Sequence, residues 1–97
     1  MDDNLFFKRI TTHHTLEWWD IHLKTNSVKV ESGCRLWLAG KNGDGYAQTG
    51  VFPHQEKGHR VAYQIAHPEA NITTKLVCHS CDIRHCIEPG HLFPGTH

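Results

Sequence analysis

Three potential metal ligands recur at intervals of five residues near the end of the chain. They are Cys81, Cys86 and His91, and they lie in a polar stretch that is too short to bury itself. Thiolate sulfur and imidazole nitrogen are ligands that Zn²⁺ prefers, and a closed structural zinc site needs four of them in a tetrahedron. The stretch therefore predicts a zinc knuckle that takes its fourth ligand from elsewhere, and we expect Cys34 to supply it.

Two residues just before the knuckle leave other ligand sets open. Cys78 and His79 end a short segment that we expect to be extended. Adjacent side chains on such a segment point to opposite faces, so we place Cys78 outside the zinc set as a small buried residue. The alternatives are a local set that includes Cys78 or His79, with Cys34 as a buried free thiol.

Other landmarks in the chain follow one known order. They are Cys34-Arg35-Leu36-Trp37-Leu38-Ala39-Gly40, Gly45-Tyr46, His59-Arg60-Val61-Ala62-Tyr63, Val77-Cys78-His79, Cys81-Asp82, His91-Leu92-Phe93 and Gly95-Thr96. With them, residues 34–97 resemble the zinc-binding HNH homing endonucleases, which are related to the His-Cys-box endonucleases and have the ββα-metal nuclease fold. The chain departs from the family pattern in the knuckle, where Ile83-Arg84 replaces the usual Asn-Pro.

The resemblance implies metal-dependent hydrolysis of DNA. The family uses a histidine at the end of the first strand of its motif as general base, which corresponds to His79, and a basic residue near the scissile phosphate, which corresponds to Arg60. The family also holds a catalytic Mg²⁺ or Mn²⁺ with an Asn on a helix shortly after its Gly-Thr, whereas this sequence ends at His97. We therefore expect a truncated metal-ligand helix, with His97 as a candidate ligand in place of the Asn.

The resemblance also nominates residues for contact with double-stranded DNA. In related enzymes a hairpin lies in the major groove, and its polar residues contact bases or phosphates. The corresponding residues here are Arg35, Lys41, Asn42, Gln48 and Thr49. The expected protein is a DNA endonuclease of phage or mobile-element kind with structural zinc. The alternatives are an inactive, truncated HNH zinc module that binds DNA or protein, and an interaction domain led by its Trp-rich N-terminal helix.

Composition limits these functions only in part. The chain has 97 residues, enough for one small core that often needs a metal for stability. Its formal net charge is +0 at pH 7, so overall charge does not indicate a nucleic-acid ligand, although ten histidines would make it cationic in mild acid. No apolar run approaches the roughly 20 residues of a membrane span. Four cysteines without a secretory segment predict a reducing, cytoplasmic location.

Periodicity predicts the elements that position these residues in an α+β fold. We expect an N-terminal helical segment over residues 1–30, which offers a surface for a homodimer or protein partner, and a zinc-stabilised HNH-like ββα-metal domain over residues 31–97. One short helix would be capped by Asp2 or Asp3, and a second would begin at Thr15 with Trp18 as its partly exposed ring.

The second part should contain a hairpin and a helix. Residues 35–39 alternate as in a strand, the cluster at 42–45 favours a turn, and residues 46–52 would return as a second strand. Residues 28–30 give a weak strand or linker signal. Helical spacing over residues 59–66 predicts a helix that Pro68 ends and that covers the sheet.

Overall fold

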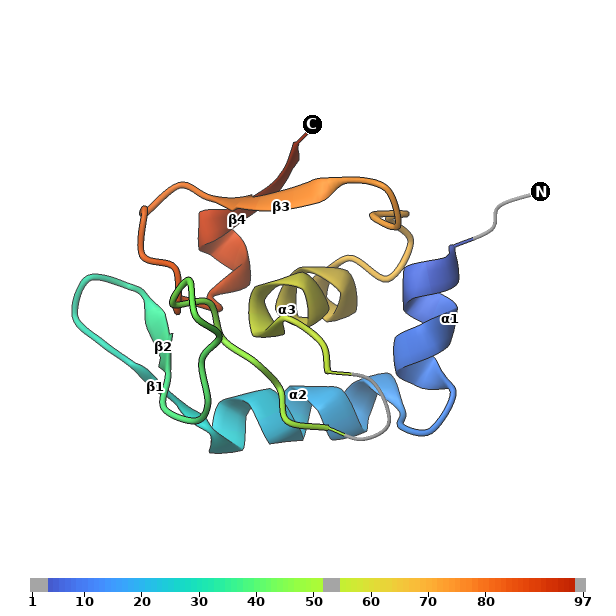
Figure 1. Ribbon diagram of the computed structural model, residues 1–97, viewed down its shortest axis with the longest axis horizontal. Helices are drawn as coiled ribbons and strands as arrows, with labels where there is room; N and C mark the ends of the chain where they lie inside the picture. Colours follow the sequence, from blue (N-terminus) through green and yellow to red (C-terminus); the bar gives the residue numbers. More distant parts are fainter. Residues whose placement is uncertain (1–3, 52–54, 96–97) are drawn as a thin grey trace.

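The computed structural model describes residues 4–51 and 55–95 of the chain (Figure 1). Over these ranges it contains three α-helices, a short 3₁₀ helix and two antiparallel sheets of two strands each, so the α+β class is confirmed. In chain order the elements are α1 (Leu5–Thr11), α2 (Leu16–Thr25), β1 (Ser27–Lys29), β2 (Arg35–Trp37), α3 (Gly58–Ala66), β3 (Leu76–His79), η1 (Pro89–His91) and β4 (Leu92–Gly95).

The first two helices begin at side-chain caps. Asn4 accepts a hydrogen bond from the backbone N–H of Phe7 at 3.1 Å and so caps α1, while the expected caps Asp2 and Asp3 lie outside the described residues. Asn4 also donates to the carbonyl of Ala70 at 2.8 Å, which fastens α1 to the segment after α3. Thr15 caps α2 as predicted, because its hydroxyl accepts from the N–H of Trp18 at 3.0 Å.

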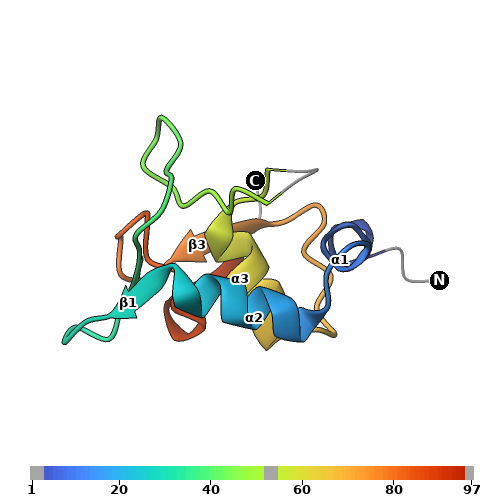
Figure 2. The ribbon, with the colours of Figure 1, turned by 90° about the horizontal axis from the view of Figure 1, so that it is seen from below.

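Helix α3 lies at the centre of the molecule, between α2 and the pair formed by β3 and β4 (Figures 1 and 2). It begins at Gly58, where a Cβ atom would lie 2.9 Å from the Cβ of Ala47. Glycine is therefore needed at this close approach. The helix ends at Ala66, shortly before Pro68, as the sequence predicts.

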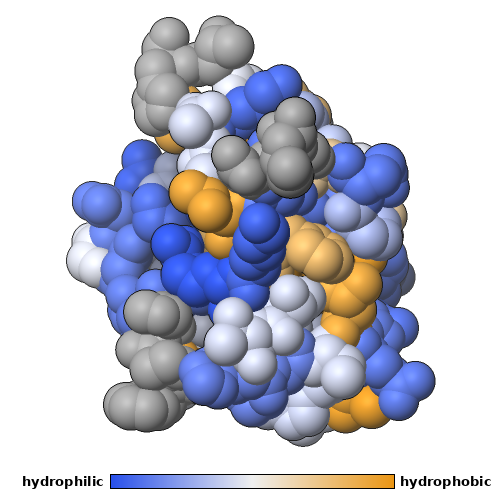
Figure 3. All heavy atoms as spheres, turned by 90° about the vertical axis from the view of Figure 1, so that its right-hand side faces the viewer, coloured by the Kyte–Doolittle hydropathy of each residue, from blue (hydrophilic) through white to orange (hydrophobic). Residues whose placement is uncertain are grey.

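One hydrophobic core joins both parts of the sequence. It combines residues of α1 and α2 with residues of α3, the strands and the knuckle: Phe6, Ile10, Trp19, Leu23, Trp37, Ala47, Val61, Ala62, Ile72, Val77, Ile87 and Leu92. Trp18 remains 37% exposed, as expected for the ring that lies off the apolar stripe of α2. Seen from the side of α1, hydrophobic patches on the surface are separated by hydrophilic side chains (Figure 3). Segment 1–30 thus contributes directly to the core of the remaining chain.

The predicted partner of the first strand is wrong. β2 pairs with β1, in a register that places Ser27 opposite Trp37, and not with residues 46–52. The expected turn does form, because the Asn42 side chain accepts from the N–H groups of Asp44 and Tyr46. Beyond the turn, as far as the structure describes the chain to residue 51, there are isolated bridges and no strand, and Ala47 packs against Gly58.

The strand predicted before the knuckle is confirmed. β3 ends at His79 and pairs antiparallel with β4, so that His79 lies opposite Leu92 and Leu76 opposite Gly95. The short helix η1 leads directly into β4. His97, the candidate ligand for a catalytic ion, lies outside the described residues. Among the helices that the structure describes, each is too short or too polar to cross a bilayer.

Candidate metal centre and histidine pocket

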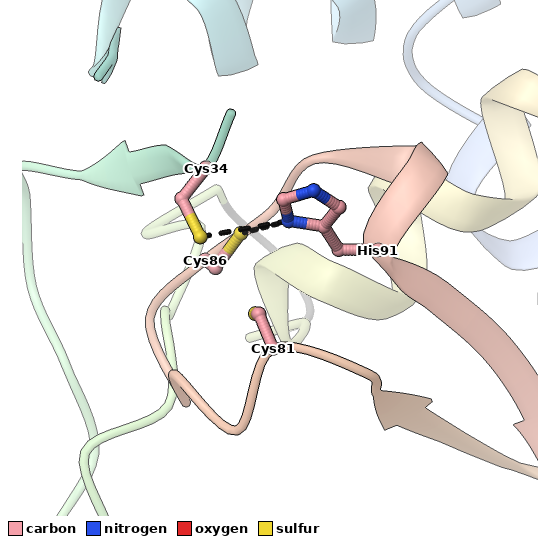
Figure 4. Close-up of side chains that lie close together, drawn as sticks. All are labelled: Cys34, Cys81, Cys86 and His91. Atoms are coloured by element: carbon pink, nitrogen blue, oxygen red, sulfur yellow. Dashed lines mark hydrogen bonds between the residues drawn. The ribbon is translucent and has the colours of Figure 1, made fainter. Parts of the chain in front are cut away.

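The four expected zinc ligands lie close together (Figure 4). Their ligand atoms, three Sγ atoms and one imidazole nitrogen, all lie within 4.8 Å of one another. Nδ1 of His91 is 3.5 Å from the sulfur of Cys34 and 3.7 Å from that of Cys86. In a tetrahedral zinc site the bond lengths place sulfur and nitrogen about 3.6 Å apart. Cys34, Cys81, Cys86 and His91 could therefore hold a metal ion, and their arrangement is compatible with structural zinc.

Cys34 immediately precedes β2, and this strand brings it to the knuckle from a distant part of the chain. The N–H of Ile87 donates to the carbonyl of Arg35 at 2.8 Å, and the N–H of Trp37 donates to the carbonyl of His85 at 2.9 Å. These bonds lay β2 along the second half of the knuckle. Gly33 precedes Cys34 with a φ of 93°, a conformation that favours glycine. The strand and its glycine together direct the Cys34 sulfur at His91.

The knuckle itself depends on one left-handed residue. Asp82 has a φ of 59°, which Asp tolerates better than bulky residues do. The turn then closes where the N–H of Cys86 donates to the carbonyl of Ile83 at 3.0 Å. Ile83-Arg84 thus occupies this turn without displacing the ligands on either side.

Burial disfavours the charged form of two of the four candidate ligands. Cys34 is 1% exposed and Cys86 is fully buried. Burial raises the pKa of the Cys86 thiol to about 12, although backbone N–H groups of Glu88 and Arg35 favour its thiolate. A bound metal would stabilise that thiolate directly. Cys78 lies outside this ligand group, on β3 beside Gly95. It is half-buried, whereas the sequence predicts a buried residue.

A separate polar pocket of about 580 Å³ opens beside the knuckle. It lies between β3, the start of α3, the knuckle and the turn before Ala47. Its lining residues are Tyr46, Lys57, His59, Arg60, Leu76, Val77, Cys78, His79, Asp82 and Arg84. Four of them carry a formal charge, of which Lys57, Arg60 and Arg84 are cationic and Asp82 is anionic.

His79 is held by the knuckle in a defined tautomer. Its Nε2 lies 2.9 Å from the carbonyl oxygen of Cys86. Because a carbonyl only accepts, Nε2 carries the proton and Nδ1 is left as an acceptor. Burial lowers the pKa of His79, while the bond to Cys86 and the charge of Asp82 act in the opposite direction. The ring is therefore suited to accept a proton at Nδ1 near neutral pH.

Two further rings lie against His79. The His59 ring is 4.8 Å from the His79 ring and 5.2 Å from the Tyr46 ring, measured between centroids. His59 is only 4% exposed, and burial first, then the charges of neighbouring side chains, lowers its pKa to about 3. It is neutral at physiological pH.

The basic residue that the resemblance places near a phosphate is tied to the backbone. The Arg60 guanidinium donates to the carbonyls of Lys75 at 2.6 Å and Ile72 at 2.8 Å, and it lies over the Phe6 ring. It lines the pocket, yet these bonds use its two Nη atoms to hold the segment after α3. Its catalytic role stays a prediction.

The residues nominated for DNA contact do not share one surface. Arg35 lines a different groove, between α2, α3 and η1. Thr49 is 4% exposed, so its side chain is buried, and its contact with DNA stays a prediction. Asn42 uses its Oδ1 to form the turn. Lys41 is exposed and Gln48 half-buried, and the contacts of these two residues with DNA remain predictions.

Sequence reasoning missed two cations of the pocket. Lys57 and Arg84 each lie 5.5 Å from the centre of the Tyr46 ring, and Arg84 also donates to the carbonyl of Asp44 at 2.8 Å. Arg84 therefore links the knuckle to the turn. For Arg84 the sequence did offer a signal, because it belongs to the Ile83-Arg84 pair that stands where the family that the chain resembles has Asn-Pro.

No protein-family model matches the chain, and neither a curated protein nor a solved structure is similar to it.

Proposed function

We propose that the chain is an HNH-type DNA endonuclease with structural zinc, in which His79 is the general base. The observation that carries this proposal is the bond from Nε2 of His79 to the Cys86 carbonyl, which leaves Nδ1 as the proton acceptor in a polar, cationic pocket. The order of landmarks from Cys34 to Thr96 supports the same family.

The pocket residues suggest a division of labour in phosphodiester hydrolysis. Nδ1 of His79 takes a proton from the water that attacks phosphorus, and the bond from Nε2 holds the ring while the charge develops. The P–O bond to the leaving oxygen breaks, and that oxygen takes a proton from solvent water. Lys57 and Arg84 attract the phosphate. Both cations lie over the Tyr46 ring, and this contact keeps them beside the histidine. These cations give the neutral chain a local positive surface for DNA.

The structural zinc has a defined place in this proposal, whereas a catalytic ion has none. Cys34, Cys81, Cys86 and His91 would hold the zinc, which neutralises buried thiolates and fixes the knuckle. Within residues 4–51 and 55–95 no second group of three or more His, Cys, Asp or Glu side chains could hold a metal. We therefore assign no step of the reaction to Mg²⁺ or Mn²⁺.

Plasmid nicking in Mg²⁺ or Mn²⁺ tests the proposal. His79→Ala should reduce nicking by about 10²- to 10⁴-fold, the usual contribution of a general base, while zinc content and melting temperature stay close to wild type. His67→Ala is the matched control, because its ring contacts Tyr63 at the end of α3 and not the pocket. Equal nicking by wild type and His79→Ala would show that His79 is not the base.

A second candidate is a zinc module that binds DNA without cutting it. Its support is the lack of a second metal-ligand group in the described part of the chain. If purified wild type and His79→Ala both leave plasmid intact, and wild type still shifts a DNA duplex in low salt, this candidate replaces the nuclease.

A further inference from the structure

The His59 side chain is buried without using its full hydrogen-bonding capacity. Its Nδ1 is buried without a partner, and the residue is 4% exposed. The ring packs against the rings of Tyr46 and His79. Packing therefore places the His59 ring beside the histidine that ends β3.

The buried His59 ring lies where it limits the movement of the His79 ring. The two rings are 4.8 Å apart and inclined by 36°, and Tyr46 stacks on His59 at 5.2 Å with an inclination of 26°. The terminal torsion of a histidine is broad and allows the ring to turn over, which would exchange Nδ1 with Cδ2 and Nε2 with Cε1 and so take Nε2 off the Cys86 carbonyl. A packed ring beside His79 opposes that turn.

We propose that His59 is a positioning residue, whose buried ring holds His79 with Nε2 on the Cys86 carbonyl and Nδ1 toward the pocket. Its catalytic consequence rests on the proposed function, whereas its effect on the His79 ring does not. The ring supplies the contact, and its burial against Tyr46 holds it in place.

Two substitutions separate these contributions. His59→Gln removes the aromatic ring and retains polar hydrogen-bonding atoms. His59→Phe retains a ring of similar size and removes the polar atoms. His67→Gln is the matched control at the opposite end of the same helix, outside the pocket. Zinc content and circular dichroism establish that each protein is folded.

Nitrogen-15 NMR of the histidine side chains reads the ring directly. Wild type, His59→Phe and His67→Gln should show His79 as a single tautomer protonated on Nε2, whereas His59→Gln should show a mixture of both neutral tautomers. A single Nε2-protonated His79 in folded His59→Gln, or an equal mixture in His59→Phe, would overturn the proposal.

Cleavage kinetics test the catalytic consequence. His59→Gln should lower kcat by about 10- to 100-fold, the range expected when a reacting group is displaced by about an ångström, with KM unchanged. His59→Phe should stay within about threefold of wild type, as rescue by a ring requires. If wild type does not cleave, the endonuclease proposal fails while the tautomer measurement still decides the role of His59.

Discussion

Replacing Cys34 by Ser should release the metal and lower the thermal stability of the domain. Cys34 contributes the ligand that is most distant in sequence, and its sulfur is 1% exposed beside Nδ1 of His91. A hydroxyl in its place is a poor zinc ligand, and the remaining three ligands all belong to one short stretch. Without Cys34 the metal no longer links β2 to the knuckle.

The loop that this link closes sets the magnitude. A cross-link over about 45 residues removes about 4 kcal/mol of chain entropy from the unfolded state, by the relation used for disulfides. In a domain of this size 1 kcal/mol changes Tm by about 4–8 °C, so Cys34→Ser should melt about 15–30 °C below the zinc-loaded wild type. Loss of the metal's own binding energy would add to this difference.

Metal analysis and thermal unfolding followed by circular dichroism check the prediction, with Cys78→Ser as the matched control. Cys78 is a partly exposed thiol on β3 outside the ligand group, so its replacement should retain one zinc per chain and a Tm within a few degrees of wild type. Cys34→Ser protein that keeps its zinc and its Tm would refute the site. Loss of zinc from Cys78→Ser alone would favour the local ligand set.

Two further measurements test the charges of the fold. Between about pH 6 and pH 5, wild type should lose about 1 kcal/mol more stability than His59→Gln, because burial lowers the pKa of His59 to about 3 and only the unfolded chain then binds its proton. The stability that neutral His59 contributes is complete above pH 6.5 and is lost as the pH falls toward 3. Equal losses of unfolding free energy in urea titrations of both proteins would contradict this prediction. Arg9→Met should cost about 2 kcal/mol, because it leaves the Glu56 carboxylate, 7% exposed, without its bidentate partner. The exposed pair of Lys24 and Asp20 supplies the control, since Lys24→Met should cost less than about 0.5 kcal/mol, and similar urea midpoints for both variants would argue against a buried pair.

Features that depend on near neighbours in the chain could be predicted from the sequence. The Thr15 cap, the end of α3 before Pro68 and the strand that ends at His79 follow from caps, breakers and short-range periodicity. The spacing of Cys81, Cys86 and His91 belongs to the same class, because one short loop brings all three ligands together.

Tertiary structure decided the features that join distant segments. β2 pairs with β1, and the residues after the turn pack against Gly58 instead. No local sequence pattern encodes this close approach of Ala47 to Gly58. The carbonyl that orients His79 belongs to Cys86, and the burial of His59 depends on β3 and Tyr46 together. Strand pairing and burial depend on contacts across the whole chain, whereas periodicity records only which face of each element is apolar. The sequence therefore identified the four candidate metal ligands and most helices, and only the packed fold determined the surroundings of the histidine that we propose as the base.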